Sequence, residues 1–220
     1  MPKHYLDEDV LTAARARIAR TFDDFERIYV SFSAGKDSTV MLHLVAEEAR
    51  KRGRKIGLML IDLEGQYRVT MEHAQECFDL YADIVTPYWI CLPIDLRNAV
   101  SVYQPKWRCW EPGKQDIWIR KPPPIAITDP NVFPFFSEGM EFEEFVPEFG
   151  EWFSEGEKTA VMVGIRSDES LNRYRTISSS TKETWEGLQW TSRVTENTWN
   201  VYPIYDWRTE DIWTYHGRNP

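Results

Sequence analysis

Apolar residues near the N-terminus recur at helical spacing and then give way to a β-type run. Within residues 8–25 they stand three or four positions apart, which predicts an amphipathic helix (Leu11, Ala14, Ile18, Phe22 and Phe25). Residues 28–32 form a short β-prone run, and helical spacing returns from Val40. Residues 33–35 between them are small and predict a tight turn. We therefore expect strand, turn and helix in that order, with the helix beginning near Ser38.

Two further runs are apolar almost throughout their length. Residues 55–62 and 84–92 predict strands covered on both faces, and residues 67–81 between them have helical spacing. Consecutive strand-helix-strand units of this kind favour an open, mostly parallel sheet with right-handed crossovers and helices on both faces. The sequence therefore predicts an α/β fold of the Rossmann-like type.

An irregular segment interrupts this pattern at about residues 102–136. It contains seven prolines and the tryptophans Trp107, Trp110 and Trp118, too many aromatic residues for a disordered linker. We expect an ordered insertion that is buried against the sheet or covers a pocket. Beyond it the pattern predicts a helix at 142–152, a buried strand at 159–165 and a short helix at 209–216, whereas residues 176–198 predict no element. We expect a single domain over residues 1–220 that contains this insertion.

The charge balance of the chain is acidic. Its 220 residues include 26 Lys and Arg against 35 Asp and Glu, a formal net charge of −9. Such a chain repels polyanions and anionic membrane surfaces, so general nucleic-acid binding is not expected. No apolar run reaches the roughly 18 to 20 residues of a membrane span, and the first residues lack the order of a secretory signal. We therefore expect a cytoplasmic protein that does not bind membranes.

The cysteines and histidines do not have the spacing of a metal site. Cys77, Cys91 and Cys109 are 14 and 18 positions apart, which fits neither a disulfide framework nor a CxxC zinc site. The four histidines show no paired ligand spacing, so zinc is not expected. Cys77 lies on the apolar stripe of a predicted helix and is expected in the core. Cys109 has cationic neighbours, so a reactive thiolate there is an alternative to simple packing.

The turn after the first predicted strand carries the strongest chemical signal. In residues 33–38 (SAGKDS) the small residues let the backbone approach an anion, and the following helix directs its positive end at that anion. Lys36 and the hydroxyls of Ser33 and Ser38 could complete a phosphate cradle. The alternative is a turn in which Asp37 or Ser38 only caps the helix. The Walker pattern GxxxxGK(S/T) does not occur at this turn, which argues against ordinary γ-phosphate transfer.

Three segments resemble motifs of one protein superfamily, in the same order. Residues 33–38 resemble the SGGKDS-type pyrophosphate loop of the adenine nucleotide α-hydrolases, with Ala34 in place of the first glycine. Residues 164–170 (GIRSDES) resemble the GxRxxES signature of the phosphoadenosine phosphosulfate (PAPS) reductase family. Residues 202–213 resemble its P-(I/L)-x-x-W and D-(I/V)-W element. Residues 62–67 and the tryptophan-rich insertion look most like the immunoglobulin-binding regulator A type subgroup.

The resemblance implies a set of site residues. Lys36, Asp37 and Arg166 are the expected catalytic residues. The expected nucleotide- and phosphate-binding residues are Ser31, Ser33, Ala34, Gly35, Lys36, Asp37, Ser38, Asp62, Gly164, Arg166, Glu169 and Ser170. Arg166 follows a buried-type strand, so it would emerge at the carboxyl edge of the sheet and bind a phosphate or sulfate. The alternative is a structural ion pair of Arg166 with Asp168 or Glu169.

Other charged residues extend this expected site. Arg173 and Arg175 would add to a positive rim. Asp62, at the end of the second predicted strand, could accept a hydrogen bond from a ribose hydroxyl or, with Asp37, help to hold Mg²⁺. Glu64 is a second candidate for the same role, or a solvated loop carboxylate.

The function expected from the resemblance is Mg-dependent cleavage of ATP between the α- and β-phosphates, which adenylates a substrate and releases pyrophosphate. PAPS is the other candidate substrate, but reductases of the family use a cysteine in a C-terminal ECG(I/L)H-type segment, and this sequence ends at Asn219-Pro220 without one. A third alternative is a nucleotide-binding regulatory module that meets a protein partner through the insertion. A homodimer is compatible with each alternative, and no iron–sulfur cluster is expected.

Overall fold

A six-stranded sheet lies at the centre of the fold in the computed structural model, which describes residues 7–100 and 102–219. In spatial order the strands are β3 (Val85–Ile90), β2 (Ile56–Ile61), β1 (Arg27–Ser31), β6 (Thr159–Val163), β8 (Thr198–Val201) and β7 (Thr191–Arg193). Neighbouring strands are parallel except β7, which pairs antiparallel to β8. The predicted open, mostly parallel sheet is confirmed.

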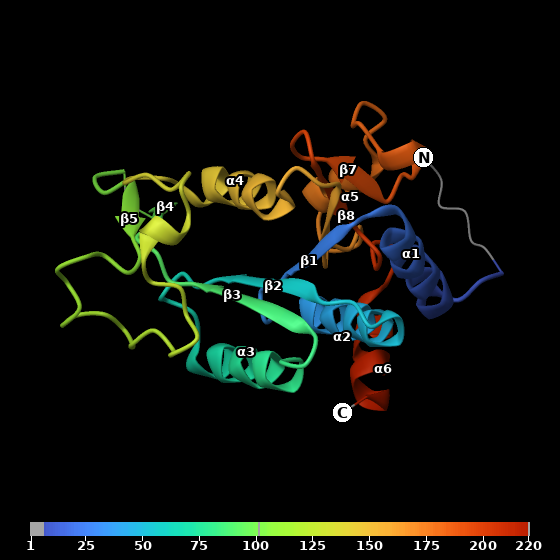
Figure 1. The fold of residues 1–220 in the computed structure, drawn as a ribbon, viewed down its shortest axis with the longest axis horizontal. Helices are drawn as coiled ribbons and strands as arrows, with labels where there is room; N and C mark the ends of the chain where they lie inside the picture. The colour runs from blue at the N-terminus through green and yellow to red at the C-terminus, as the bar shows by residue number, and fades with distance from the viewer. Residues whose placement is uncertain (1–6, 101, 220) are drawn as a thin grey trace.

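Helices cover both faces of this sheet (Figure 1). On one face lie α2 (Lys36–Arg52) and α3 (Arg68–Leu80), and on the other lies α4 (Phe142–Ser154), whose Phe149 and Phe153 pack on Tyr29 of β1. The first helix, α1 (Val10–Asp24), and the last, α6 (Thr209–Arg218), both contact α2. In the described parts of the chain, no helix is long and apolar enough to cross a membrane.

Two regions differ from the sequence-based expectation. The helix α2 begins at Lys36, two residues before the predicted start, because the extended Gly35 is its N-cap. The helix α5 (Leu171–Ser178) and the strands β7 and β8 were not predicted. Among the residues of α5, Ile177 is the buried one, so no apolar stripe marks this helix in the sequence.

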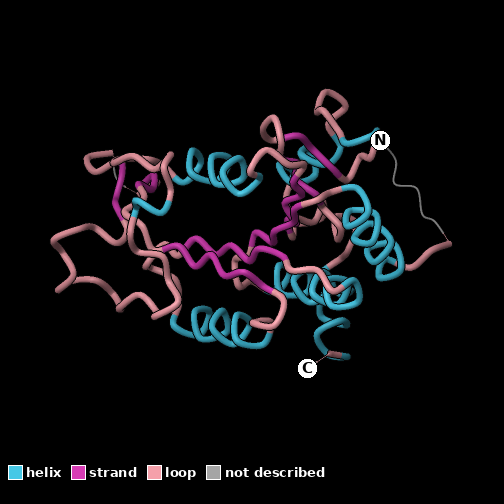
Figure 2. The backbone as a smooth tube through the Cα atoms, viewed as in Figure 1, coloured by secondary structure: helices cyan, strands magenta, loops and turns pink. Residues whose placement is uncertain are grey.

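The insertion is irregular and packed against the edge of the sheet. It continues from the hairpin of β4 (Asp95–Arg97) and β5 (Lys106–Arg108) and includes a short 3-10 turn, η1 (Pro130–Val132), but most of it is loop (Figure 2). Ile127 donates its backbone N–H to Trp89 at the end of β3, so the insertion covers this edge strand. Trp110 is buried in it.

The strand order defines where a ligand can bind. From β1 the chain proceeds to β2 and β3 on one side of the sheet, and to β6 and β8 on the other. The carboxyl ends of β1 and β6 therefore flank a topological switch point, where open α/β sheets form a ligand-binding crevice. The loop of residues 33–38 follows β1, and the loop of residues 164–170 follows β6. The fold thus brings two of the three motifs to one crevice.

Candidate functional site

The loop of residues 33–38, called here the PP-loop, is held in shape by its own hydroxyl groups. Ser33 Oγ and Ser38 Oγ are 3.0 Å apart, and Ser38 Oγ donates to the carbonyl of Gly35 at 3.0 Å. The N-cap Gly35 makes no side-chain cap for α2, so the capping alternative for Asp37 or Ser38 is not what the structure shows. The positive end of α2 therefore faces the crevice without a side-chain cap, an arrangement that suits an anion.

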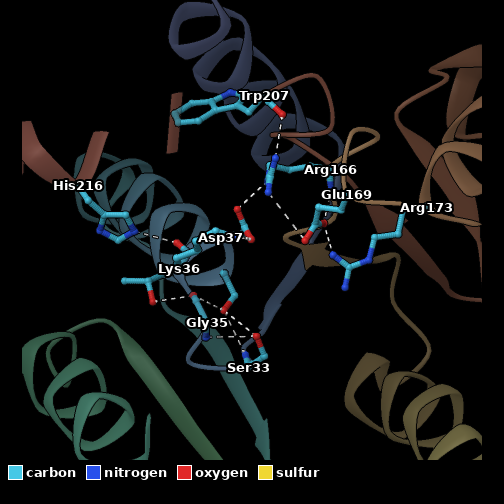
Figure 3. A network of polar contacts seen from close by, with 11 residues as sticks. Ser33, Gly35, Lys36, Asp37, Arg166, Glu169, Arg173, Trp207 and His216 are labelled. Carbon is cyan, nitrogen blue, oxygen red and sulfur yellow. Dashed lines mark hydrogen bonds and ion pairs between the residues drawn. The ribbon is translucent and has the colours of Figure 1, made fainter. Parts of the chain in front are cut away.

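The loop after β6 touches the start of α2 (Figure 3). A Cβ atom on Gly164 would lie 3.1 Å from both Cα and N of Ser38, which is closer than side chains normally approach backbone. Arg166 Nε donates to Asp37 Oδ1 at 2.7 Å, and Arg166 Nη1 donates to the Trp207 carbonyl at 3.4 Å. The three sequence motifs thus meet at the guanidinium of Arg166.

The side chain of Arg166 is only 3% exposed. Besides Asp37, its guanidinium lies 3.9 Å from Glu169, whose carboxylate also accepts the backbone N–H of Arg166. The guanidinium is therefore paired rather than open in this structure, and its predicted contact with a phosphate or sulfate remains a prediction. The structural ion pair is present, with Asp37 as its principal partner and Glu169 as the second.

Lys36 provides the accessible charge of the PP-loop. Its side chain is 34% exposed and its Nζ lies 2.6 Å from Asp37 Oδ2. On the other side of the cluster Arg173 pairs with Glu169. Lys36, Asp37, Arg166, Glu169 and Arg173 thus form one network of three cations and two carboxylates, with a formal charge of 3 − 2 = +1. A net positive network beside an uncapped helix start favours an anionic ligand.

Ser31 and Ser170 have structural positions at the borders of this network. Ser31 is the last residue of β1 and lies opposite Met59 of β2 and Val163 of β6. Ser170 is the N-cap of α5, and its hydroxyl accepts the backbone N–H of Arg173 at 3.2 Å. Their predicted contact with a nucleotide remains a prediction.

Asp62 is bound through its carboxylate by residues of β3 and of the insertion. Its side chain is fully buried, and its carboxylate accepts hydrogen bonds from Arg120 Nη2 at 2.6 Å, Trp89 Nε1 at 2.9 Å and the backbone N–H of Glu64 at 2.9 Å. Glu64 is also buried, and it accepts backbone N–H groups of the insertion. Both carboxylates anchor the insertion.

All three cysteines are buried. Cys109 Sγ donates to the carbonyls of Leu92 and Ile94 at 3.4 Å, and burial raises the pKa of this thiol to about 12. Burial likewise raises the pKa of Cys77 to about 11 and shifts that of Cys91 upward. The packing alternative for Cys109 is what the structure shows.

Three of the four histidines, His43, His73 and His216, line a separate cavity of about 400 Å³ between α2, α3 and α6, and His4 lies outside the described residues. There His43 Nδ1 lies 2.9 Å from the hydroxyl of Tyr215, and His73 Nε2 lies 2.9 Å from the hydroxyl of Thr39. Within residues 7–100 and 102–219, no group of three or more His, Cys, Asp or Glu side chains is placed to hold a metal ion. These histidines serve helix packing in this structure.

Two features of the site were not found from the sequence. His216 of α6 contacts the backbone carbonyl of Lys36 at 3.0 Å, and Arg120 of the insertion binds Asp62. The position of His216 just after the D-(I/V)-W element was an available signal. Arg120 has no comparable signal, because it lies in a segment without periodicity.

A comparison with protein families matches the C-terminal part of the chain. Residues 138–220 match the family model of the phosphoadenosine phosphosulfate reductase domain. This match over the C-terminal part of the chain agrees with the PAPS reductase-like family that the three motifs predicted. The narrower resemblance to the immunoglobulin-binding regulator A type subgroup is not confirmed.

Two individual proteins are similar to this chain. The uncharacterized protein YbdN of Escherichia coli strain K12 is 46% identical over 214 residues, which are 96% of this chain and 52% of YbdN. The chain therefore spans about half the length of this relative. The U34-tRNA thiolase NcsA from Methanococcus maripaludis, solved with its 4Fe-4S cluster, matches with a TM-score of 0.47 and 12% identity over 98% of this chain and 65% of that chain.

The cofactor prediction was wrong. It excluded an iron–sulfur cluster, whereas the similar thiolase was solved with its 4Fe-4S cluster. It also placed Mg²⁺ at Asp37 and Asp62, but both carboxylate oxygens of each residue already have protein partners. The two carboxylates belong to separate clusters, one in the PP-loop and one in the insertion. These residues do not fit a shared cation site.

Proposed function

We propose that this chain binds an adenine nucleotide at the crevice between the carboxyl ends of β1 and β6, and cleaves ATP between its α- and β-phosphates. The observation that carries the proposal is the meeting of the PP-loop and residues 164–170 at the topological switch point of the sheet. The net positive network and the uncapped start of α2 support an anionic ligand at this place. The family match supports an adenine nucleotide.

The residues of the crevice suit the departure of pyrophosphate. The backbone at the start of α2 and the ammonium of Lys36 would hold the β- and γ-phosphates. A nucleophile of the acceptor attacks the α-phosphorus, the bond to the bridging oxygen breaks, and its electron pair leaves on pyrophosphate. Lys36 stabilises the charge that develops on this leaving group. Buried Arg166 acts through Asp37 and is a positioning residue for the PP-loop.

A regulatory module that binds a nucleotide and a protein partner is the second candidate. It is favoured by Ile117 and Ile119 of the insertion, which are each 70% exposed. Reduction of PAPS has less support, because none of the three buried cysteines of this chain offers a thiolate. Homodimer formation and a cytoplasmic location remain predictions.

The test is to incubate the chain with ATP labelled at the α-phosphate, with and without added divalent cations, and to measure AMP and pyrophosphate. Binding of ATP and PAPS is measured in parallel by calorimetry. Lys36→Met is compared with Lys51→Met, which removes an exposed lysine at the other end of α2. Formation of AMP and pyrophosphate that Lys36→Met suppresses supports the enzyme. Binding without turnover supports the module, and no binding of either nucleotide contradicts the proposal.

A further inference from the structure

Two acidic side chains at the end of β2 hold the central part of the insertion, residues 109–120, by several hydrogen bonds. Glu64 accepts the backbone N–H of Trp110 at 2.7 Å with one carboxylate oxygen and that of Ile119 at 3.1 Å with the other. The Asp62 carboxylate accepts a hydrogen bond from Arg120 Nη2 at 2.6 Å. The backbone carbonyl of Asp62 accepts a second one from the indole N–H of Trp110, also at 2.6 Å. Trp110 and Ile119, nine positions apart in an irregular loop, are thereby hydrogen-bonded to the same turn after β2.

Asp62, Glu64 and Trp110 are buried, so water cannot readily replace the hydrogen bonds that they make. The side chain of Asp62 is 0% exposed, and Glu64 and Trp110 are 8% and 2% exposed. A buried carboxylate must keep its hydrogen-bond donors, because an unpaired buried charge is strongly unfavourable. The Arg120 guanidinium also lies over the Trp110 ring at 5.2 Å, and Trp118 meets that ring edge-on at 5.3 Å.

The backbone at both ends of this contact is in an uncommon conformation. Glu64 and Trp110 have φ values of 63° and 51°, in the left-handed region that residues with side chains rarely adopt. Such conformations persist where surrounding contacts overdetermine them, and they concentrate at functional sites. Here the hydrogen bond of Trp110 to Glu64 joins the two strained residues directly.

The anchored segment lies at the same edge of the sheet as the PP-loop. Residue Ser31 at the end of β1 pairs with Met59 of β2, and Asp62 follows Met59 by three residues. The carboxyl ends of these two neighbouring parallel strands carry the PP-loop and the anchored segment. A nucleotide on the PP-loop would therefore have residues 109–120 beside it on the β2 side.

We infer that residues 109–120 are a fixed wall of the nucleotide crevice and that Asp62 and Glu64 are the positioning residues of this wall. The inference rests on the proposed function for the position of the nucleotide, but not for the anchoring itself. It assigns the two carboxylates a role other than binding ribose or a cation. In this inference the wall closes the β2 side of the crevice.

Hydrogen–deuterium exchange of the whole chain tests the anchoring without any activity. Glu64→Gln replaces one carboxylate oxygen by an amide donor, and Asp62→Asn and Arg120→Met break the ion pair from either side. We expect the amide of Trp110 or that of Ile119 to exchange on the order of 10-fold faster in Glu64→Gln, because the amide nitrogen that replaces one carboxylate oxygen cannot accept its N–H. Lys114→Met, which removes an exposed ion pair within the same segment, should leave these amides unchanged.

A double-mutant cycle separates the wall from direct nucleotide binding. If Asp62 serves the wall, Asp62→Asn and Arg120→Met weaken ATP binding to a similar extent, and the double variant is no worse than either. If Asp62 contacts the nucleotide itself, Asp62→Asn weakens binding and Arg120→Met does not, which overturns the inference. Unchanged exchange of residues 109–120 in all three single variants also overturns it.

The remaining outcomes separate this inference from the proposed function. Faster exchange with unchanged ATP affinity shows that the segment is anchored but is not a wall of the crevice, and so contradicts the inference. If the unaltered chain binds no nucleotide, the proposed function fails, while the exchange result still reports on the anchors. Thermal unfolding of each variant is recorded, and Glu64→Gln retains the test if the loss of Asp62 or Arg120 prevents folding.

Discussion

Arg166 donates from Nε to Oδ1 of Asp37 at 2.7 Å, and this contact joins residues 129 positions apart in the chain. It connects the loop after β6 to the first turn of α2, at the point where Gly164 already approaches Ser38. Because Arg166 also reaches the Trp207 carbonyl, one buried side chain links the segments that carry all three sequence motifs. The shape of the crevice therefore depends on this guanidinium even if no ligand touches it.

Replacement of Arg166 by methionine should lower both stability and nucleotide affinity. The substitution leaves the carboxylates of Asp37 and Glu169 without their buried partner, which costs about 3 to 5 kcal/mol when a buried pair is broken from one side. Urea denaturation measures the loss. Arg173→Met, which removes a half-exposed partner of Glu169, is the matched control and should cost about 1 kcal/mol or less. Similar losses in the two variants would contradict a structural role for the Arg166 pair.

Replacement of Lys36 by methionine should reduce ATP affinity without unfolding the chain. Lys36 is partly exposed, and loss of one charge-assisted contact to phosphate costs about 1.5 to 3 kcal/mol of binding free energy. Calorimetry and urea denaturation measure binding and stability separately. The double variant Asp37→Ala with Ser38→Ala should also bind ATP weakly, but it removes the partner of Arg166 and a buried hydroxyl, so it should lose stability as well.

Much of the sheet could be predicted because its strands are buried on both faces. The runs at 55–62 and 84–92 correspond to β2 and β3, and the stripe at 67–81 corresponds to α3. The helix α5 could not be found in this way, because its exposed surface leaves Ile177 as its buried residue. Periodicity reports burial, so an exposed short helix gives no signal.

The site could be predicted only where it is local in sequence. The PP-loop is one continuous segment, and it was placed correctly between a strand and a helix. The partner of Asp62 could not be predicted, because Arg120 lies 58 residues away in a segment without regular structure. Because Asp62 follows a strand at the edge of the sheet, the sequence predicted that it binds ribose or a cation. In the structure it binds Arg120 of the insertion.

Ala34→Gly should stabilise the chain. Ala34 has a φ of 56° at the position where the resembled motif has its first glycine. A left-handed conformation is unfavourable by roughly 1 to 2 kcal/mol for a residue with a Cβ, and a more flexible unfolded chain offsets part of the gain. We expect a net increase in unfolding free energy of up to about 1 kcal/mol, measured by urea denaturation. Ala46→Gly, in the interior of α2, should have the opposite sign.

Acid should weaken the attachment of the hairpin β4–β5 to α4. The side chains of Lys106 and Arg97 lower the pKa of Glu141, the N-cap of α4, so this carboxyl is more acidic folded than unfolded. A carboxyl with a lowered pKa stabilises the fold at pH values above its unfolded pKa of about 4.3. This stabilisation is lost as the pH falls through the pKa of the folded state. The protection factors of the hairpin amides, which correct for the intrinsic effect of pH on exchange, should fall more between pH 5 and pH 3 in the unaltered chain than in Glu141→Gln.

The thiols of the folded chain should react slowly. Because burial raises the pKa of Cys77 to about 11 and that of Cys109 to about 12, both remain protonated at pH 8, where a free cysteine is partly ionised. Labelling by a disulfide reagent at pH 8 should be slow in the native chain and fast in urea. Rapid native labelling that Cys109→Ser abolishes would show that this cysteine is accessible after all.

The same burial predicts that this chain does not by itself reduce PAPS to sulfite with thioredoxin. Reduction needs a thiolate that attacks sulfur and a mobile cysteine that a second thiol can then reach. Cys109 is held by the carbonyls of Leu92 and Ile94, and neighbouring Arg108 pairs with Asp95 and Glu138 and leaves no cation for a thiolate. The measurement is sulfite release with reduced thioredoxin for the unaltered chain and for Cys109→Ser. We expect none from either, and sulfite that disappears in Cys109→Ser would make this chain a reductase with its nucleophile in the insertion.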